Sequence, residues 1–143
     1  MLKVWQIAGG TGITPFYQLL QYLSAQTEIK PDLTLIYASA SPSEVLLRQE
    51  LEDAATKYQG KTIIRWLVDQ SSDKSKLDKV GRLSTSDLSK WLGDRQRKTL
   101  AIVCGPEGMV DAVAGPRPRS RDMRGVRGML GELGWHENEV RRL

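Results

Sequence analysis

Cysteine, histidine and long apolar runs are scarce in this chain of 143 residues, and each scarcity excludes a kind of site or structure. Cys104 is the sole cysteine, so no disulfide can form within the chain, and a reducing compartment is the default expectation. His136 is the sole histidine and has no cysteine, aspartate or second histidine at ligand spacing, so a metal site is not expected. No apolar run approaches the roughly 20 residues of a membrane span, and no Ser-His-acid set accompanies a nucleophile elbow.

Positive charge is unevenly distributed along the chain. The formal net charge is +4, but most of the excess comes from arginines crowded into residues 117–127. Such a local cluster says little about the rest of the surface, so nucleic-acid binding is not expected. Residues 115–125 are rich in glycine, proline and arginine and lack apolar periodicity, which predicts a mobile loop. Two interpretations of its arginines stay open: a solvated insertion, or a segment that docks an acidic partner or a membrane surface.

Short apolar runs alternate with segments of helical periodicity along the whole chain. Such alternation predicts a doubly wound α/β fold, with a mainly parallel five-stranded sheet in one domain over residues 1–143. Residues 69–80 are polar and are expected to form a surface loop. The expected strands are the run from Val4 and residues 33–38, 63–68, 100–104 and 139–143. The first expected helix spans residues 15–26, and the second begins at a capping box of Ser41 and Glu44 and ends at Gly60. A third helix is expected to begin at Ser84 with Asp87, and it is followed by a helix over residues 107–114 and a last helical turn over 129–133.

The tryptophans test this assignment of elements. Trp5, Trp66 and Trp91 fall on expected core elements and are interpreted as packing residues. Trp135 falls on none of the expected elements, so its environment is not predicted.

The stretch from Val4 to Pro15 contains the first candidate site. An apolar run ends in Gly9 and Gly10, and Pro15 then opens a segment with helical spacing. A strand, a tight glycine turn and a helix start form a phosphate seat, because glycines let backbone N–H groups approach the anion and the helix N-terminus carries partial positive charge. Pro15 replaces the third glycine of the ordinary dinucleotide fingerprint, so the match to that motif is weak.

A second glycine turn follows the run at residues 100–104. It has the form C-G-P-x-x-M, from Cys104 to Met109, and both turns are expected at the carboxyl edge of the sheet. With Gly-Gly-Thr-Gly-Ile-Thr-Pro of the first turn, this motif resembles the NAD(P)H-binding domain of the ferredoxin–NADP reductase superfamily, in its cytochrome-b5-reductase-like branch. Residues 43–51 are similar to the acidic-x-L-L-R-x-E-L helix of that branch, and residues 81–83 match its short G-R-[VL] element. The resemblance covers residues 4 to about 114.

The resemblance implies a role for each matching position. Gly10, Thr11 and Gly12 would face the pyrophosphate and the nicotinamide ribose, with Thr11 close to the nicotinamide. Cys104 would lie beside the nicotinamide ring and help hold it for hydride transfer to a flavin, so Cys104 and Thr11 are the candidate catalytic residues. Core packing is the alternative for Cys104, because free cysteine is among the most buried residue types. The implied cofactor-binding set is Gly9, Gly10, Thr11, Gly12, Pro15, Ser39, Glu44, Arg48, Gly105, Pro106 and Met109.

Glu44 bears on the choice of dinucleotide. In the family an acidic residue here is associated with NADH, because a carboxylate repels the 2′-phosphate of NADPH. Asp69 and Gln70 also stand where NADPH-using relatives bind that phosphate with a Ser-Arg pair, so NADH is expected rather than NADPH. Glu44 can equally serve as the helix cap, and the two roles are compatible. Arg48 stays open between a contact with the nucleotide and a solvated helix face.

The flavin domain of the family has no counterpart in this sequence. Relatives place a β-barrel with an R-x-[YF]-[ST] motif before the nucleotide domain, and this chain has neither the motif nor the length for a barrel. The resemblance implies FAD in the full-length enzyme, held by a domain of the same or another chain, with electrons passing on to a haem or another one-electron acceptor protein. The chain alone is expected to bind the dinucleotide and to turn over nothing. A non-catalytic α/β module that binds a partner is the alternative.

Overall fold

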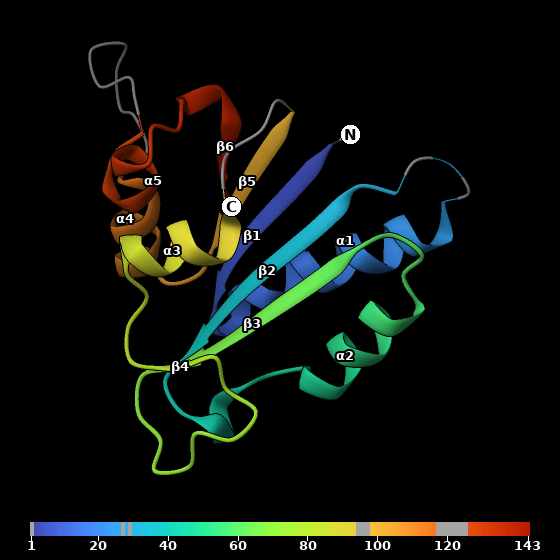
Figure 1. Cartoon of the computed structure of the whole chain (residues 1–143), viewed down its shortest axis with the longest axis horizontal. Helices are drawn as coiled ribbons and strands as arrows, with labels where there is room; N and C mark the ends of the chain where they lie inside the picture. Colours follow the sequence, from blue (N-terminus) through green and yellow to red (C-terminus); the bar gives the residue numbers. More distant parts are fainter. Residues whose placement is uncertain (1, 27, 29, 94–97, 117–125) are drawn as a thin grey trace.

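The computed structural model describes residues 2–26, 28, 30–93, 98–116 and 126–143. In this part of the chain, six parallel strands form one sheet in the order β4-β3-β2-β1-β5-β6 (Figure 1). The doubly wound, parallel α/β fold is confirmed, with six strands where five were expected. The elements are β1 (Lys3–Gly9), η1 (Gly10–Ile13), α1 (Thr14–Ala25), β2 (Asp32–Ser39), η2 (Pro42–Glu44), α2 (Arg48–Lys57), β3 (Thr62–Val68), β4 (Lys79–Val80), α3 (Thr85–Leu92), β5 (Thr99–Cys104), α4 (Glu107–Ala114), α5 (Gly128–Glu132), η4 (Glu137–Glu139) and β6 (Val140–Arg142).

The additional strand, β4, lies at the end of the segment expected to be a surface loop. Lys79–Val80 pairs with the last two residues of β3. Residues 69–78 lie outside helices and strands, as expected, and the expectation is wrong for the two residues that follow. A two-residue strand carries too short a pattern to be recognised from hydrophobic periodicity.

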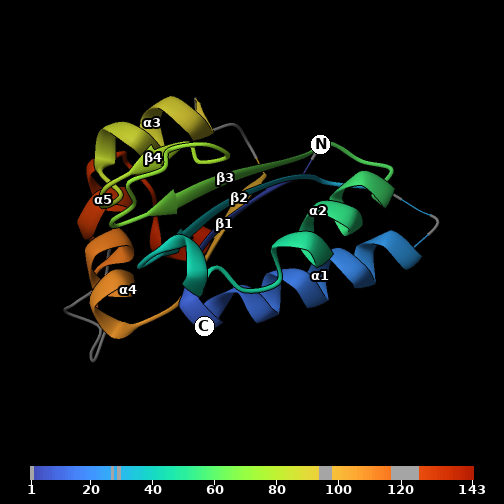
Figure 2. The same cartoon turned by 90° about the horizontal axis from the view of Figure 1, so that it is seen from below.

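Helices cover both faces of the sheet, which produces two hydrophobic cores. Figure 2 shows α1 and α2 on one face and α3 and α5 on the other. Strand β1 is buried almost throughout, because it lies in the middle of the sheet between two covered faces. The core under α1 and α2 includes Val4, Ala8, Phe16, Leu20, Leu35, Tyr37, Leu51, Tyr58 and Trp66, and the core under α3, α4 and α5 includes Trp5, Ile7, Ile36, Leu88, Val103, Val113, Leu130 and Trp135.

Trp5, Trp66 and Trp91 are packing residues, as predicted. Trp5 and Trp66 are buried, and Trp91 is half-buried against the core under α3. Trp135 is buried as well, and its ring centroid lies 4.9 Å from that of Trp5. The segment that precedes β6 is therefore anchored to the central strand of the sheet.

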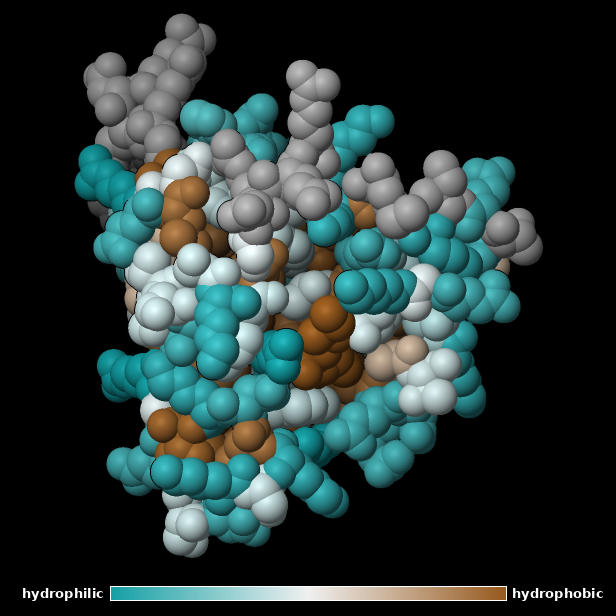
Figure 3. Space-filling model, in the orientation of Figure 1, coloured by the Kyte–Doolittle hydropathy of each residue, from teal (hydrophilic) through white to brown (hydrophobic). Residues whose placement is uncertain are grey.

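The surface is mainly hydrophilic on the face shown in Figure 3, with a hydrophobic area near its middle, over β3. Residues 62–65 of β3 are half-buried, whereas its last three residues are buried. Strand β4 pairs only with Leu67 and Val68, so the first part of β3 has no strand partner on its outer side within the described residues.

Helix α2 begins later than the sequence predicts. The predicted capping box is not formed, because the Ser41 hydroxyl donates to the Glu44 carboxylate at 3.0 Å and the cap makes no side-chain bond to backbone. Instead, Pro42–Glu44 forms one 3₁₀ turn, Val45 is extended at φ −73° and ψ 114°, and α2 starts only at Arg48. The β-branched Val45 favours extended backbone, and it interrupts the helix that Ser41 was expected to start.

Helix α3 begins as predicted, at a capping box. The Ser84 hydroxyl accepts from the Asp87 N–H at 3.2 Å, and the Asp87 carboxylate accepts from the Ser84 N–H at 2.9 Å and from Lys79 Nζ at 2.5 Å. Burial alone would raise the pKa of Asp87, but the hydrogen bonds from Lys79 and Ser84 outweigh it and hold that pKa below its usual value. Lys79 therefore links β4 to the start of α3.

The predicted arginine-rich loop begins where α4 ends. Gly115, at φ 77°, ends α4, and residues 117–125 of the predicted arginine-rich loop lie outside the described residues. No helix within the described ranges is long and apolar enough to cross a membrane.

Candidate functional site

The two glycine turns meet at the carboxyl edge of the sheet. Strands β1 and β5 are neighbours, and Ala8 pairs with Cys104 immediately before the two turns. A Cβ atom on Gly12 would lie 2.5 Å from the carbonyl carbon of Cys104 and 2.8 Å from the amide nitrogen of Gly105. Real Cβ atoms essentially never come this close to backbone, so only glycine allows the first turn to pack on the second. Segments far apart in the sequence thus form one continuous surface.

Met109 completes the contact between the turns from α4. A Cβ atom on Gly9 would lie 2.5 Å from the Met109 sulfur, and one on Gly105 would lie 2.8 Å from its methyl carbon. Pro106 is the exposed N-cap residue of α4 and also borders Gly9. Gly9, Gly105, Pro106 and Met109, all predicted as site residues, therefore lie together.

Open space lies above the first turn. Gly10 adopts the left-handed region at φ +54°, and a Cβ atom placed on it would meet nothing within 4 Å. Thr11 is exposed, and Pro15 lies in the first turn of α1, which continues directly from η1. The helical N-H groups and the partial positive charge at this end suit an anion lying over Gly10 and Thr11.

Cys104 is the last residue of β5, and it is a free, half-buried thiol. Its backbone carbonyl packs against Gly12, so the residue borders the first turn directly. The residue is thus less buried than a core cysteine, and its place beside the nicotinamide stays a prediction.

Two predicted polar residues, Ser39 and Glu44, lie at and after the carboxyl end of β2. Ser39, the last residue of β2, is 8% exposed, and its hydroxyl oxygen is buried without a hydrogen-bond partner among the described residues. The Asp69 N–H donates to the Ser39 carbonyl at 3.0 Å, which brings the end of β3 alongside. Glu44 lies further along the chain and is exposed. An orphaned hydroxyl at this edge is a polar group that a bound ligand can satisfy.

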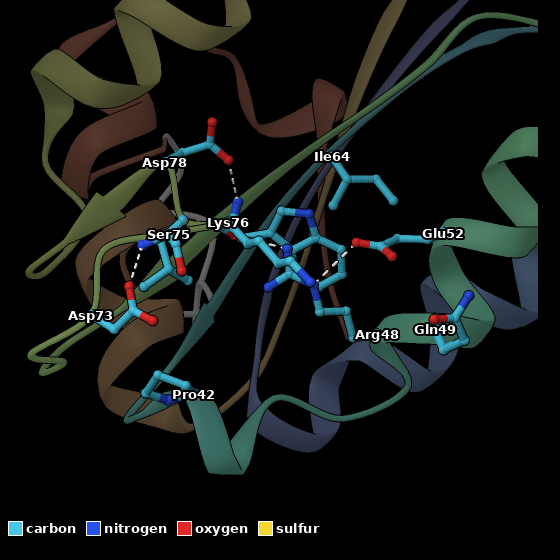
Figure 4. A pocket seen from close by; sticks show the side chains of 11 residues that line it. Pro42, Arg48, Gln49, Glu52, Ile64, Asp73, Ser75, Lys76 and Asp78 are labelled. Carbon is cyan, nitrogen blue, oxygen red and sulfur yellow. Dashed lines mark hydrogen bonds and ion pairs between the residues drawn. The ribbon is translucent and has the colours of Figure 1, made fainter.

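Arg48 begins α2 and is partly exposed, and its approach to the nucleotide stays a prediction. Its guanidinium lies 4.3 Å above the Trp66 ring, pairs with Glu52 at 3.1 Å and donates to the Lys76 carbonyl at 2.8 Å. Arg48, Glu52, Trp66 and Lys76 line a groove of about 870 Å³ between α2 and residues 73–78, at the outer edge of β3. Figure 4 shows Arg48 beside Glu52 and Lys76 there. Arg48 therefore links that loop to α2.

Asp78 holds the other end of the same loop against β3. Its carboxylate accepts from the Trp66 N–H at 2.7 Å and from Arg65 at 3.3 Å, while its own N–H donates to the Trp66 carbonyl at 2.8 Å. These bonds satisfy backbone groups of β3 just before β4 begins. The sequence carries no signal for them, because a polar loop residue can be assigned no partner from spacing alone.

Tyr37 is the main site residue that sequence reasoning missed. Its ring is buried in β2, and its hydroxyl lies between two segments of the edge, accepting from the Leu46 N–H at 2.9 Å and donating to the Gly10 carbonyl at 3.3 Å. An aromatic residue in a buried strand is ordinarily interpreted as packing, so its hydroxyl gives no sequence signal.

A doubly wound parallel sheet with two glycine turns packed together at its carboxyl edge defines a dinucleotide-binding domain. The family model described as oxidoreductase NAD-binding domain matches residues 6–115. The chain belongs to this family, and its predicted membership is confirmed.

Relatives in sequence are oxidoreductases. The chain is 35% identical over 135 residues to NADH-cytochrome b5 reductase 2 of Candida glabrata, covering 94% of this chain and 45% of that protein. It is 31% identical over 134 residues to the protein of that name from Candida albicans, covering 94% of this chain and 44% of the relative. The chain thus spans less than half the length of these relatives.

Solved structures share the fold. The cytochrome b5 reductase domain of Ulva prolifera nitrate reductase matches with a TM-score of 0.80 at 24% identity, covering 99% of this chain and 49% of that chain. The CS-b5R domains of human Ncb5or, in the NAD⁺ form, match with a TM-score of 0.77 at 20% identity, covering 99% and 36%. Both likenesses extend over the six-stranded sheet and its helices.

Proposed function

We propose that this chain binds NADH and holds its nicotinamide for hydride transfer to a flavin carried outside residues 1–143. The observation that carries the proposal is the direct packing of the Gly9–Gly12 turn on Cys104 and Gly105 at the carboxyl edge. That packing unites the two motifs on which the family resemblance depends. The relatives named NADH-cytochrome b5 reductase 2 are more than twice as long as the matched region, which leaves room in them for a flavin domain.

The glycine turns would receive the pyrophosphate and the nicotinamide. Gly10 and Thr11 lie at the helix start, where open space and backbone N–H groups suit the pyrophosphate. Thr11 and Cys104 would flank the nicotinamide and orient it, and Pro106 and Met109 would form the wall beside it. The thiol would act by position alone, because the hydride moves between the two cofactors. FAD, when bound by its own domain, would accept that hydride.

The adenosine end of NADH would lie over the ends of β2 and β3. The Ser39 hydroxyl, which has no hydrogen-bond partner in the part of the chain that the structure describes, offers a buried hydrogen-bonding group there. Glu44 and Asp69 are exposed carboxylates on the two segments that follow these strands, and both would repel a 2′-phosphate. NADH rather than NADPH is therefore the proposed dinucleotide. Electrons would pass from the flavin to a haem protein or another one-electron acceptor, as the names of the relatives suggest.

Calorimetry on the 143-residue chain tests the binding function directly. We expect NADH and NAD⁺ to bind with micromolar to millimolar affinity, because the pyrophosphate seat is formed without the flavin domain. Reduction of an added one-electron acceptor by the chain and NADH alone should be absent. A folded sample that binds neither nucleotide at millimolar concentration would contradict the proposal and leave a partner-binding α/β module as the alternative.

Charge reversal at Glu44 tests the choice of dinucleotide. Glu44→Arg should raise the affinity for NADPH relative to NADH by about tenfold, because an arginine replaces repulsion of the 2′-phosphate by attraction. Competition titrations with the two nucleotides measure the ratio. Glu28→Arg is the matched control, since it makes the same charge change on an exposed residue before β2, at the opposite edge of the sheet. An equal ratio in the two variants would restrict Glu44 to its bond with Ser41.

A further inference from the structure

Tyr37 joins two segments of the dinucleotide edge through one hydroxyl. The ring is 1% exposed and packs against Trp66, with 5.8 Å between the ring centroids. The hydroxyl donates to the carbonyl of Gly10 at 3.3 Å and accepts from the N–H of Leu46 at 2.9 Å. Gly10 belongs to the proposed pyrophosphate turn, and Leu46 lies in residues 45–47, which directly follow the η2 turn that carries Glu44.

Each of the two segments contains a residue in the left-handed region of the backbone. Gly10 is a left-handed glycine at φ +54°, and glycine has more conformational freedom than any other residue. Residues 45–47 lie between η2 and α2, with Val45 extended and Leu47 left-handed at φ 58°. Neither segment forms a strand or an α-helix, so a hydrogen bond to the buried Tyr37 of β2 is well placed to define where each lies.

We propose that Tyr37 is a positioning residue that sets the distance between the pyrophosphate turn, Gly9–Gly12, and the adenosine-side segment, residues 44–47. The inference rests on the proposed binding of NADH. A dinucleotide engages both segments at once, so its affinity depends on their spacing, as in any bivalent ligand. A mononucleotide engages one segment, and its affinity does not depend on the spacing.

The chain offers a matched control in Tyr58. Tyr58 is 5% exposed in the same core, and its hydroxyl donates to the Pro31 carbonyl at 2.6 Å. Pro31 precedes β2, so this bond lies at the amino edge of the sheet, away from the glycine turns. Tyr37→Phe and Tyr58→Phe each remove one buried hydroxyl and retain the ring.

The experiment titrates the unmodified chain and both variants with NADH, AMP and nicotinamide mononucleotide. Tyr37→Phe should weaken NADH binding about fivefold and leave both mononucleotides within about twofold, whereas Tyr58→Phe should change none of the three. Amide NMR provides a second readout. The Leu46 N–H loses its acceptor in Tyr37→Phe, so its resonance should shift upfield and its hydrogen exchange should accelerate.

The outcomes separate this inference from the proposed function. If the unmodified chain binds NADH and Tyr37→Phe binds it equally well, or loses NADH and AMP affinity alike, the positioning role is wrong while the function stands. If the unmodified chain fails to bind NADH, the function fails and the inference with it.

Should Tyr37→Phe not fold, Leu46→Pro removes the N–H that donates to Tyr37, and Leu46→Ala retains it. The proline variant should then show the selective loss of NADH affinity, and equal affinities in this pair would overturn the proposal.

Discussion

A Gly12→Ala chain is expected to lose dinucleotide binding and about 3 kcal/mol of its free energy of unfolding. The added methyl group would lie 2.5 Å from the carbonyl carbon of Cys104 and 2.8 Å from the nitrogen of Gly105, and both are backbone atoms that no rotamer change can move. The two glycine turns would have to separate. Urea denaturation followed by circular dichroism measures the stability, and calorimetry with NADH measures the binding.

Gly108→Ala is the control for this prediction. Gly108 lies in α4, beside the second turn, and a Cβ atom there would meet nothing within 4 Å. Alanine should therefore stabilise the helix by about 0.5–1 kcal/mol and leave NADH binding intact. The prediction is wrong if Gly12→Ala unfolds at the same urea concentration as the unmodified chain.

The second large effect is expected at Trp135. Trp135→Ala should lower the free energy of unfolding by about 3–5 kcal/mol, because it leaves a cavity beside Trp5 in the core under α3, α4 and α5. Tyr22→Ala truncates an aromatic residue that is 64% exposed on α1, and it should change stability by less than about 0.5 kcal/mol. Thermal and urea unfolding compare the two variants. Equal stabilities would show that the Trp135 ring contributes no packing energy.

Most elements of the fold could be predicted from local sequence patterns. The strands that begin at Asp32, Thr62 and Thr99 are rich in apolar residues, and α3 begins at a complete capping box at Ser84. The start of α2 could not be predicted, because Ser41 and Glu44 have the spacing of a capping box while their side chains bond to one another. Such competition between side-chain and backbone partners leaves no trace in residue spacing.

The candidate site could be predicted only in part. Each glycine turn carries its own motif, and a parallel sheet places both turns at its carboxyl edge. The closeness of the two turns could therefore be predicted from the sheet topology. The clamp of Arg48 on Lys76 and the two bonds of Tyr37 depend on how loops pack after the sheet has formed. Long side chains on a helix start or in a buried strand have many possible partners, and the sequence pattern does not choose among them.

The central position of β1 has a consequence for how the chain folds. Its two neighbours, β2 and β5, come from the first third and the last third of the sequence, and Trp135 packs on Trp5 from close to the other end. Contacts between segments so far apart require closure of long loops, which raises contact order and slows folding. On a ribosome, β1 can pair with β2 early, but its second edge stays exposed until β5 has been made. Until then that edge presents unpaired backbone N–H and C=O groups on a strand that is almost wholly buried in the finished sheet, so the nascent chain is open to aggregation during this interval.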